Sequence, residues 1–206
     1  RNGMTAPGMR TTKGETSNAK GFPMSDLPTV HFVEPDLDQI ALIEGQIAVF
    51  IPQTGKLDAM ARRVNRLTKG ALARFVDSEA FGKLKDGETA SLSYPTGLQA
   101  EAVLVVRMEK RTRGTSARHA GAAFGQAIGA AGGCLLSAGL KGLDDVLLGV
   151  SLGAYGFERH MTGDDSEKGP VTVMTSDADA ADRAGTVQAL ASGVCFTRDL
   201  VNEPAN

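Results

Sequence analysis

The side chains that most often catalyse reactions or bind metals lie far apart in this chain of 206 residues. The histidines are His31, His119 and His160, and none has a second histidine, a cysteine or a carboxylate at the spacing of metal ligands. Cys134 and Cys195 match no metal-binding spacing either. Motifs of the types His-x-x-x-His, Cys-x-x-Cys and Gly-x-Ser-x-Gly are absent from the sequence. The sequence therefore predicts no catalytic residue, no metal ligand, no binding residue and no cofactor in this chain.

Two pairs of adjacent carboxylates could hold a divalent cation or act as acid and base. Asp144 and Asp145 stand at the start of an expected helix, where carboxylates cap the helix and offset its dipole. Asp164 and Asp165 stand in a segment of glycine, serine and lysine, where water suffices to solvate them. We expect a structural role for the first pair and a solvated surface position for the second.

Two glycine-rich segments have the composition of loops that approach phosphates. Gly121–Gly125 lacks the Lys-Ser/Thr pair of a P-loop and lies inside an expected helix. Gly153–Phe157 resembles the Gly-x-Tyr-Gly-Tyr/Phe loop with which macro domains hold the phosphates of ADP-ribose. The other interpretation of Gly153–Phe157 is a glycine-terminated helix that passes into a strand, and we favour it. A macro-like module that binds ADP-ribose or a related nucleotide stays open as the alternative function.

The net charge of −2 hides an uneven distribution along the chain. Residues 56–118 carry thirteen Lys and Arg against seven Asp and Glu, whereas residues 119–206 carry five against eleven. A basic surface could attract an acidic partner or a phosphate backbone. We expect instead that these charges are spread over solvated helix faces, and a nucleic-acid partner stays open only as the weakest alternative.

Cysteine usage and apolar content indicate the compartment. Cys134 and Cys195 stand among apolar neighbours, which predicts buried free thiols in a reducing environment. The sequence contains no run of about eighteen apolar residues that could span a membrane. No secretory signal is visible either, since the first apolar stretch comes late and lacks a basic flank. These features predict a cytoplasmic protein without a membrane partner.

Six runs predict strands. Most are continuous and apolar, as in strands covered on both faces, whereas residues 88–94 alternate like an edge strand. The expected strands are Pro28–Val33, Gln46–Ile51, Glu88–Tyr94, Ala102–Val106, Gly133–Ser137 and Val171–Met174.

Four periodic segments predict helices, at Asp58–Val76, Ser116–Ala131, Asp144–Tyr155 and Asp177–Val201. In the second, Gly121, Gly125 and Gly129 recur every four residues, which predicts a close approach to a neighbouring element. The last helix would be about 37 Å long. Its apolar stripe consists of Val187, Leu190, Val194 and Val201. We expect this stripe to bury against this domain or against the domain to which the helix connects.

Strands that alternate with helices predict an α/β fold. Continuous apolar strands at its centre indicate a three-layer α/β/α domain with a mostly parallel or mixed sheet and helices on both faces. We divide the chain into a flexible tail or non-native leader at 1–23 and an α/β domain at 24–176. Residues 177–206 are then a helix that connects to a domain outside this chain.

The last ten residues, Thr197–Asn206, carry the most specific motif. Their sequence T-R-D-L-V-N-E-P-A-N closely resembles the [AT]-R-D-L-V-N-x-P-x-N signature of the cytosolic leucyl aminopeptidase family. Three earlier segments, Arg62–Arg66, Ser78–Lys83 and Ala154–Phe157, resemble elements of that family's N-terminal domain in the same order. In the family the signature lies at the junction between an N-terminal accessory domain, macro-like in fold, and a catalytic domain.

The resemblance implies the function of a larger protein rather than of this chain alone. The family removes N-terminal residues from peptides with two divalent metal ions, usually Zn or Mn, and assembles into hexamers. Its catalytic motif Asn-Thr-Asp-Ala-Glu-Gly-Arg is absent from this sequence. The resemblance therefore implies a non-catalytic accessory domain with a structural or oligomerisation role. Peptide substrates and metal ions would bind to a catalytic domain that this chain lacks.

Overall fold

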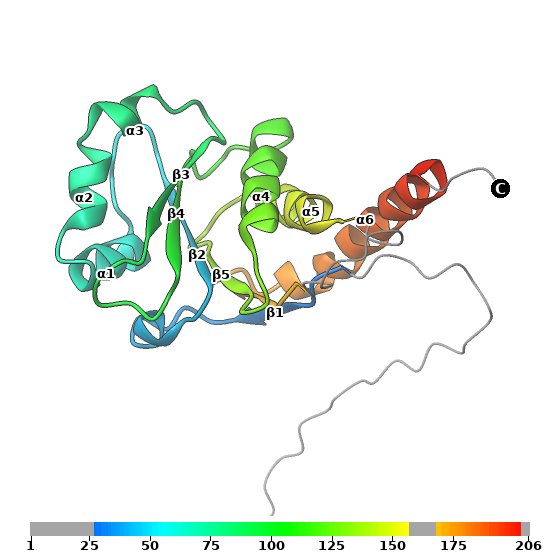
Figure 1. The fold of residues 1–206 in the computed structure, drawn as a ribbon, viewed down its shortest axis with the longest axis horizontal. Helices are drawn as coiled ribbons and strands as arrows, with labels where there is room; N and C mark the ends of the chain where they lie inside the picture. Colours follow the sequence, from blue (N-terminus) through cyan, green and yellow to red (C-terminus); the bar gives the residue numbers. More distant parts are fainter. Residues whose placement is uncertain (1–26, 157–167, 203–206) are drawn as a thin grey trace, which may run out of the picture.

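The computed structural model describes residues 27–156 and 168–202 of the chain. Its centre is a six-stranded sheet with the strand order β1-β6-β5-β2-β4-β3 (Figure 1). Every strand expected from the sequence is present. The strands are β1 (Val30–Val33), β2 (Gln46–Ile51), β3 (Thr89–Ser93), β4 (Ala102–Arg107), β5 (Gly133–Leu136) and β6 (Val171–Met174).

The sheet is mixed, as expected. The neighbouring pairs from β1 to β4 are all parallel, so these five strands end at the same edge of the sheet. Only β3 runs antiparallel, with Thr89 opposite Val106 and Ser93 opposite Ala102. It forms one border of the sheet, in agreement with its alternating sequence.

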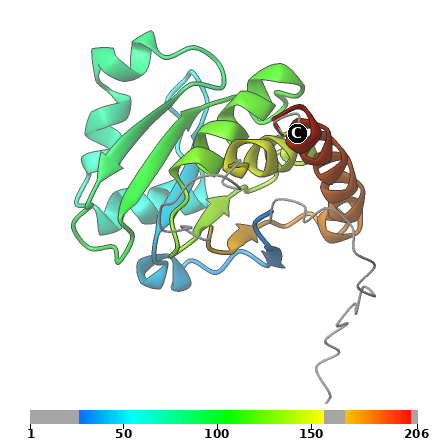
Figure 2. The same cartoon turned by 45° about the vertical axis from the view of Figure 1, so that its right-hand side comes forward.

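Helices cover both faces of the sheet, which confirms the three-layer α/β/α architecture (Figures 1 and 2). Alternate residues of β2 point to opposite layers, since Ala48 and Phe50 join one buried cluster while Ile47 and Val49 join the other. The first layer contains α4 (Thr115–Ala127), α5 (Leu143–Ala154) and the start of α6 (Ala180–Asn202). The second contains η1 (Gln39–Leu42), α1 (Ala59–Leu67), α2 (Ala71–Val76) and α3 (Glu79–Lys83).

The prediction of a single helix at Asp58–Val76 is wrong, because the structure has two helices there. Lys69 and Gly70 adopt positive φ angles of 50° and 81°, which end α1 and turn the chain. The Asn65 side chain then accepts a hydrogen bond of 2.8 Å from the backbone N–H of Ala73 in α2. A short helix, α3, was also missed, although Ser78 stands before it as an N-cap.

The helix expected at Ser116–Ala131 ends early, at Ala127, so Gly129 lies outside it. The close approach predicted from Gly121 and Gly125 is confirmed. A Cβ atom at Gly121 would lie 2.0 Å from the Val146 carbonyl oxygen, and one at Gly125 would lie 2.2 Å from the Val150 carbonyl oxygen. The backbones of α4 and α5 therefore cross in direct contact. Among the described helices, none has the length and apolar character needed to span a bilayer.

Candidate functional site

The last helix, α6, is apolar on two opposite sides. One side packs against the domain through small buried residues, Ala180, Ala191 and Cys195. The other side exposes large apolar side chains: Leu190 is 55% exposed, Phe196 39%, Leu200 48% and Val201 78%. We call these four residues the outer face of α6. A helix with apolar residues on both sides is typical of one buried between two bodies.

The stripe expected for this helix is divided between its two sides. Of its four residues, Val187 packs against the core, Val194 is half-buried, and Leu190 and Val201 are exposed. The buried side is formed instead by Ala180, Ala191 and other small residues. Small residues let the α6 backbone approach the body of the domain, and the larger side chains then point away from it.

The carboxyl-terminal half of α6 is anchored to the end of α5. The Tyr155 hydroxyl donates a hydrogen bond of 2.8 Å to Oδ1 of Asp199, whose side chain is buried. The Arg198 guanidinium lies 5.4 Å from the centre of the Tyr155 ring and donates to the carbonyl oxygen of Leu152 at 3.2 Å. Burial and the hydrogen bond to Asp199 raise the pKa of Tyr155. These contacts fix the direction in which α6 leaves the domain.

Asp144 ties the amino-terminal end of α6 to α5. The Arg183 guanidinium contacts the Asp144 carboxylate at 2.9 Å and the Asp177 carboxylate at 2.7 Å. The hydrogen bond from Arg183 holds the pKa of Asp177 below its ordinary value. Asp144 thus joins α5 to α6, which agrees with the structural role expected for its pair. The sequence did not indicate that Arg183 is the partner of Asp144.

Asp145 ties α5 to the start of α4. Its carboxylate accepts hydrogen bonds from the backbone N–H of Gly114 at 2.8 Å and from Nε of Arg118 at 3.0 Å. The bond from Gly114 is the main cause that lowers the pKa of Asp145. The helix cap expected from this pair is wrong, because α5 has no side-chain N-cap. Asp145 instead binds the backbone N–H of Gly114, the residue that precedes α4.

The other candidate side chains named from the sequence form no common site among the described residues. His31 and His119 are exposed on separate elements, and His160, Asp164 and Asp165 lie outside the described residues. Cys134 and Cys195 are buried free thiols, as predicted, and burial raises the pKa of Cys134 to about 12. In residues 27–156 and 168–202, no group of three His, Cys, Asp or Glu side chains is close enough to hold a metal ion.

The segment Gly153–Gly156 lies at the carboxyl end of α5, and Phe157 is outside the described residues. Helix carbonyls at this end carry partial negative charge, which disfavours a phosphate. Tyr155 is engaged by Asp199, and a Cβ at Gly153 would lie 2.3 Å from the Ala122 carbonyl oxygen. The described part of this segment therefore serves to pack α5 against α4 and α6.

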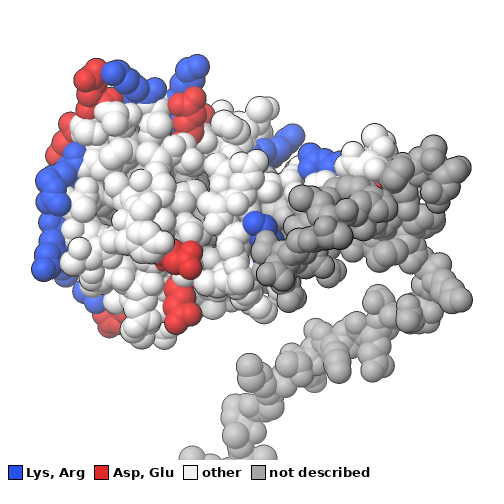
Figure 3. Space-filling view, in the orientation of Figure 1, with Lys and Arg blue, Asp and Glu red and all other residues white. Residues whose placement is uncertain are grey.

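The basic surplus of residues 56–118 is split between two places. Exposed Arg62, Arg66, Lys69 and Arg74 lie on or between α1 and α2, and Figure 3 shows Lys and Arg side chains along that edge of the molecule. A second group lies in the loops after β2 and β4, at the carboxyl edge of the sheet.

Fold and site together define a class: a three-layer α/β/α domain whose last helix carries an uncovered apolar face. No family profile matches the chain. A probable cytosol aminopeptidase of Dinoroseobacter shibae is 45% identical over 184 residues, which cover 89% of this chain and 38% of that protein. The probable cytosol aminopeptidase of Cereibacter sphaeroides is 45% identical over 178 residues, covering 86% of this chain and 36% of that protein.

A solved structure supports the fold. A mutant of tomato leucine aminopeptidase matches with a TM-score of 0.66 at 17% identity, over 89% of this chain and 40% of that chain. The chain is a homologue of the cytosol aminopeptidases and matches their N-terminal part. It spans less than two fifths of the length of these two curated relatives. The family resemblance stated from the sequence is thus confirmed.

Proposed function

We propose that this chain is the accessory domain of a metal-dependent aminopeptidase that removes N-terminal residues from peptides. Residues 24–176 form the accessory domain, and residues 177–206 connect it to a catalytic part of the parent protein. The observation that carries this proposal is the outer face of α6. Full burial of one such side chain contributes about 1.5–3 kcal/mol, so a second apolar body has a substantial driving force to cover this face.

In this proposal the metal ions bind outside this chain. The described side chains of this chain do not fit a two-metal site, because among them no three His, Cys, Asp or Glu residues lie close enough to hold a metal ion. Two Zn or Mn ions would be held by the part of the parent protein outside residues 1–206, where the peptide substrates also bind. The accessory domain contributes position and assembly, in a cytoplasmic homo-hexamer without membrane or nucleic-acid partners.

Charged substitutions on the outer face test this role in the parent protein. Phe196→Asp combined with Leu200→Asp would place two carboxylates in the interface, and we expect lower leucyl-p-nitroanilide hydrolysis, a lower Tm and a changed assembly size. Leu42→Asp is the matched control, since Leu42 is 62% exposed on η1, away from α6. It is expected to leave all three quantities near those of the unsubstituted protein.

Two results would contradict the proposal. The double variant could keep the activity, Tm and assembly size of the parent protein, which would show that the outer face of α6 is not an interface. Alternatively, the 206-residue chain with added Mn could hydrolyse leucyl-p-nitroanilide by itself. Catalysis would then lie within this chain.

A further inference from the structure

Two neighbouring parallel strands send the chain to opposite faces of the sheet. After β2 the chain continues into α1, in the layer that packs on Ile47 and Val49. After the adjacent β4 it continues into α4, in the layer that packs on Ala48 and Phe50. In open α/β sheets, ligands bind in the crevice outside the carboxyl ends of such a pair of strands. The two loops here are residues 52–58 and 108–114.

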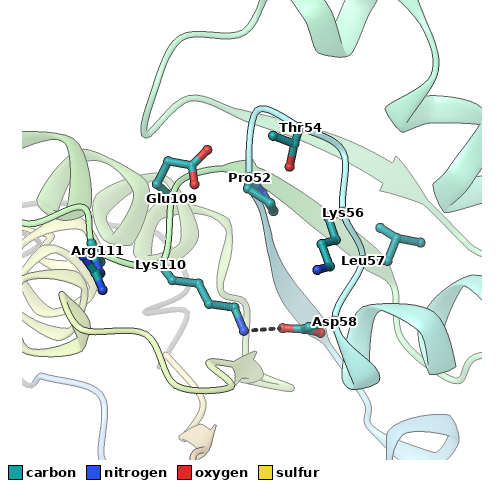
Figure 4. Close-up of a pocket in the computed structure, with 8 residues that line it drawn as sticks. All are labelled: Pro52, Thr54, Lys56, Leu57, Asp58, Glu109, Lys110 and Arg111. Carbon is teal, nitrogen blue, oxygen red and sulfur yellow. Dashed lines mark ion pairs between the residues drawn. The ribbon is translucent and has the colours of Figure 1, made fainter.

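A cavity of about 680 Å³ lies at this position. Its lining contains three cationic side chains, Lys56, Lys110 and Arg111, contributed by both loops. Figure 4 shows Lys110 reaching from one loop toward Asp58 on the other, with Lys56 pointing toward the same region. We call this cavity the edge pocket. Its volume falls within the roughly 300–1,000 Å³ that is typical of small-molecule sites.

The two carboxylates of the edge pocket are occupied by backbone groups. Oδ1 of Asp58 accepts a hydrogen bond of 2.9 Å from the N–H of Ala61 and caps α1. Oε1 of Glu109 accepts one of 3.0 Å from the N–H of Gln53. These bonds hold the two carboxylates in place, and the three cationic side chains still outnumber them in the lining.

The three cationic side chains of the edge pocket form fewer contacts than its carboxylates do. Lys110 lies 4.0 Å from Oδ2 of Asp58, at the limit of an ion pair, and is more than half exposed. Among the residues that the structure describes, Lys56 and Arg111 form no ion pair. The positive end of the α1 dipole also points to this side of the pocket, because α1 begins directly after Asp58. The combined field favours an anion.

We propose that the edge pocket binds a small phosphate monoester of about mononucleotide size. The ammonium groups of Lys110 and Lys56, which point toward the same region, supply point charges for a phosphate. Arg111 lies on the far side of Lys110 and adds to the positive field of the pocket. Pro52 and Leu57 line the same cavity and offer apolar surface for the rest of the ligand. This site is separate from α6 and does not depend on the role proposed for that helix.

Titration of the 206-residue chain with AMP, adenosine and inorganic phosphate tests the proposal by calorimetry. We expect saturable AMP binding, weaker binding of inorganic phosphate and none of adenosine. The double variant Lys110→Glu with Arg111→Glu should weaken AMP binding by roughly tenfold or more. Both side chains are exposed, so the fold should persist, as circular dichroism can check. The control Arg66→Glu with Arg74→Glu makes the same charge change on α1 and α2 and should leave the affinity within about twofold.

Several outcomes would overturn the proposal. One is the absence of saturable AMP binding at millimolar concentration, and another is adenosine binding as tight as that of AMP. Equal weakening by the control variant would show a diffuse charge effect rather than a site. A short DNA duplex that binds more tightly than AMP, and loses its binding in the Lys110/Arg111 variant, would show that the surface binds nucleic acid instead.

Discussion

Individual side chains determine where α6 lies relative to the rest of the domain. Tyr155 donates one part-buried hydrogen bond to Asp199, and Arg198 lies over the Tyr155 ring while it donates to the end of α5. Arg198 and Asp199 belong to the segment whose sequence resembles the family signature. In this chain the two residues anchor a helix, which is a structural task.

Replacement of Tyr155 by phenylalanine tests this anchor. The substitution removes the hydroxyl that donates to the buried Asp199 carboxylate, and a hydrogen bond to a charged group contributes about 1.5–3 kcal/mol. We expect urea unfolding of the 206-residue chain to show a loss of this size. Tyr94, the only other tyrosine, is 84% exposed, so Tyr94→Phe should leave the unfolding free energy nearly unchanged. Equal effects of the two substitutions would argue against the anchor.

The Asp145 carboxylate should make the domain sensitive to acid. Its pKa is lowered in the folded protein from an ordinary value of 3.8, because it accepts hydrogen bonds from Gly114 and Arg118. A carboxyl with a depressed pKa contributes stability above its ordinary pKa, and this contribution is lost as the pH falls through the lower, folded value. The unfolding free energy should therefore decrease as the pH falls below the ordinary value of 3.8 and through the lower, folded one.

Asp145→Asn should reduce this acid dependence and lower the stability at neutral pH. Asp38, whose side chain is 96% exposed, offers the control, and Asp38→Asn should preserve the pH profile. Urea midpoints measured across the acid range would decide. An unchanged profile in Asp145→Asn would mean that the carboxylate does not stabilise the fold.

For individual residues, the sequence predicted whether a side chain is buried or structural, but not which residue it contacts. The burial of Cys134 and Cys195 and the structural role of Asp144 and Asp145 follow from neighbouring residues in the chain. The bond from Gly114 to Asp145 joins residues far apart in the sequence, so no local spacing reveals it. The hydrogen bond between Tyr155 and Asp199 also joins distant residues, so the sequence did not reveal it either.

Among the elements, the crossing of α4 and α5 depends on glycine in both helices. Gly121 and Gly125 on α4 face carbonyl groups of α5, while Gly149 on α5 faces the Arg118 carbonyl oxygen at 2.1 Å from its would-be Cβ. Backbone groups cannot move aside as a flexible side chain can. The two helices must therefore separate if a side chain is added.

Gly125→Ala should destabilise the domain by about 1–3 kcal/mol or more, because its Cβ would overlap the Val150 carbonyl oxygen. Gly185→Ala in α6 is the matched control, since its Cβ would meet no atom within 4 Å. It should stabilise α6 by about 0.5–1 kcal/mol through the lower entropy of the unfolded chain. Urea unfolding of both variants measures the difference, and a neutral Gly125→Ala would show that the helices do not touch there.

Helix boundaries and faces were the least predictable features at the scale of elements. The positive φ angles of Lys69 and Gly70 divided one expected helix into two. In α6 the predicted stripe did not tell which residues face the domain, because small residues such as Ala191 and Cys195 make the close contact while Leu190 is exposed. Apolar size alone does not tell which side of a helix faces its own domain.

As a whole, the described chain has a core on each face of the sheet, with α6 extending from it (Figure 1). The sequence predicted the α/β/α class and every strand, since continuous apolar runs separated by helices leave few other architectures. It did not predict the strand order. The pairing of β1 with β6 joins Val30 to Val171, and such a distant contact is set by packing of the assembled layers.

Thiol labelling at position 200 tests most directly whether the outer face of α6 is an interface. Leu200 is 48% exposed in this chain, and the native cysteines are buried, so Leu200→Cys would supply a single reactive thiol among the residues described here. Its labelling rate would be measured by peptide mapping in the 206-residue chain and in the full-length parent protein. We predict fast labelling in the chain and labelling at least roughly tenfold slower in the parent protein, where a second body covers the outer face. Equally fast labelling in both proteins would contradict it.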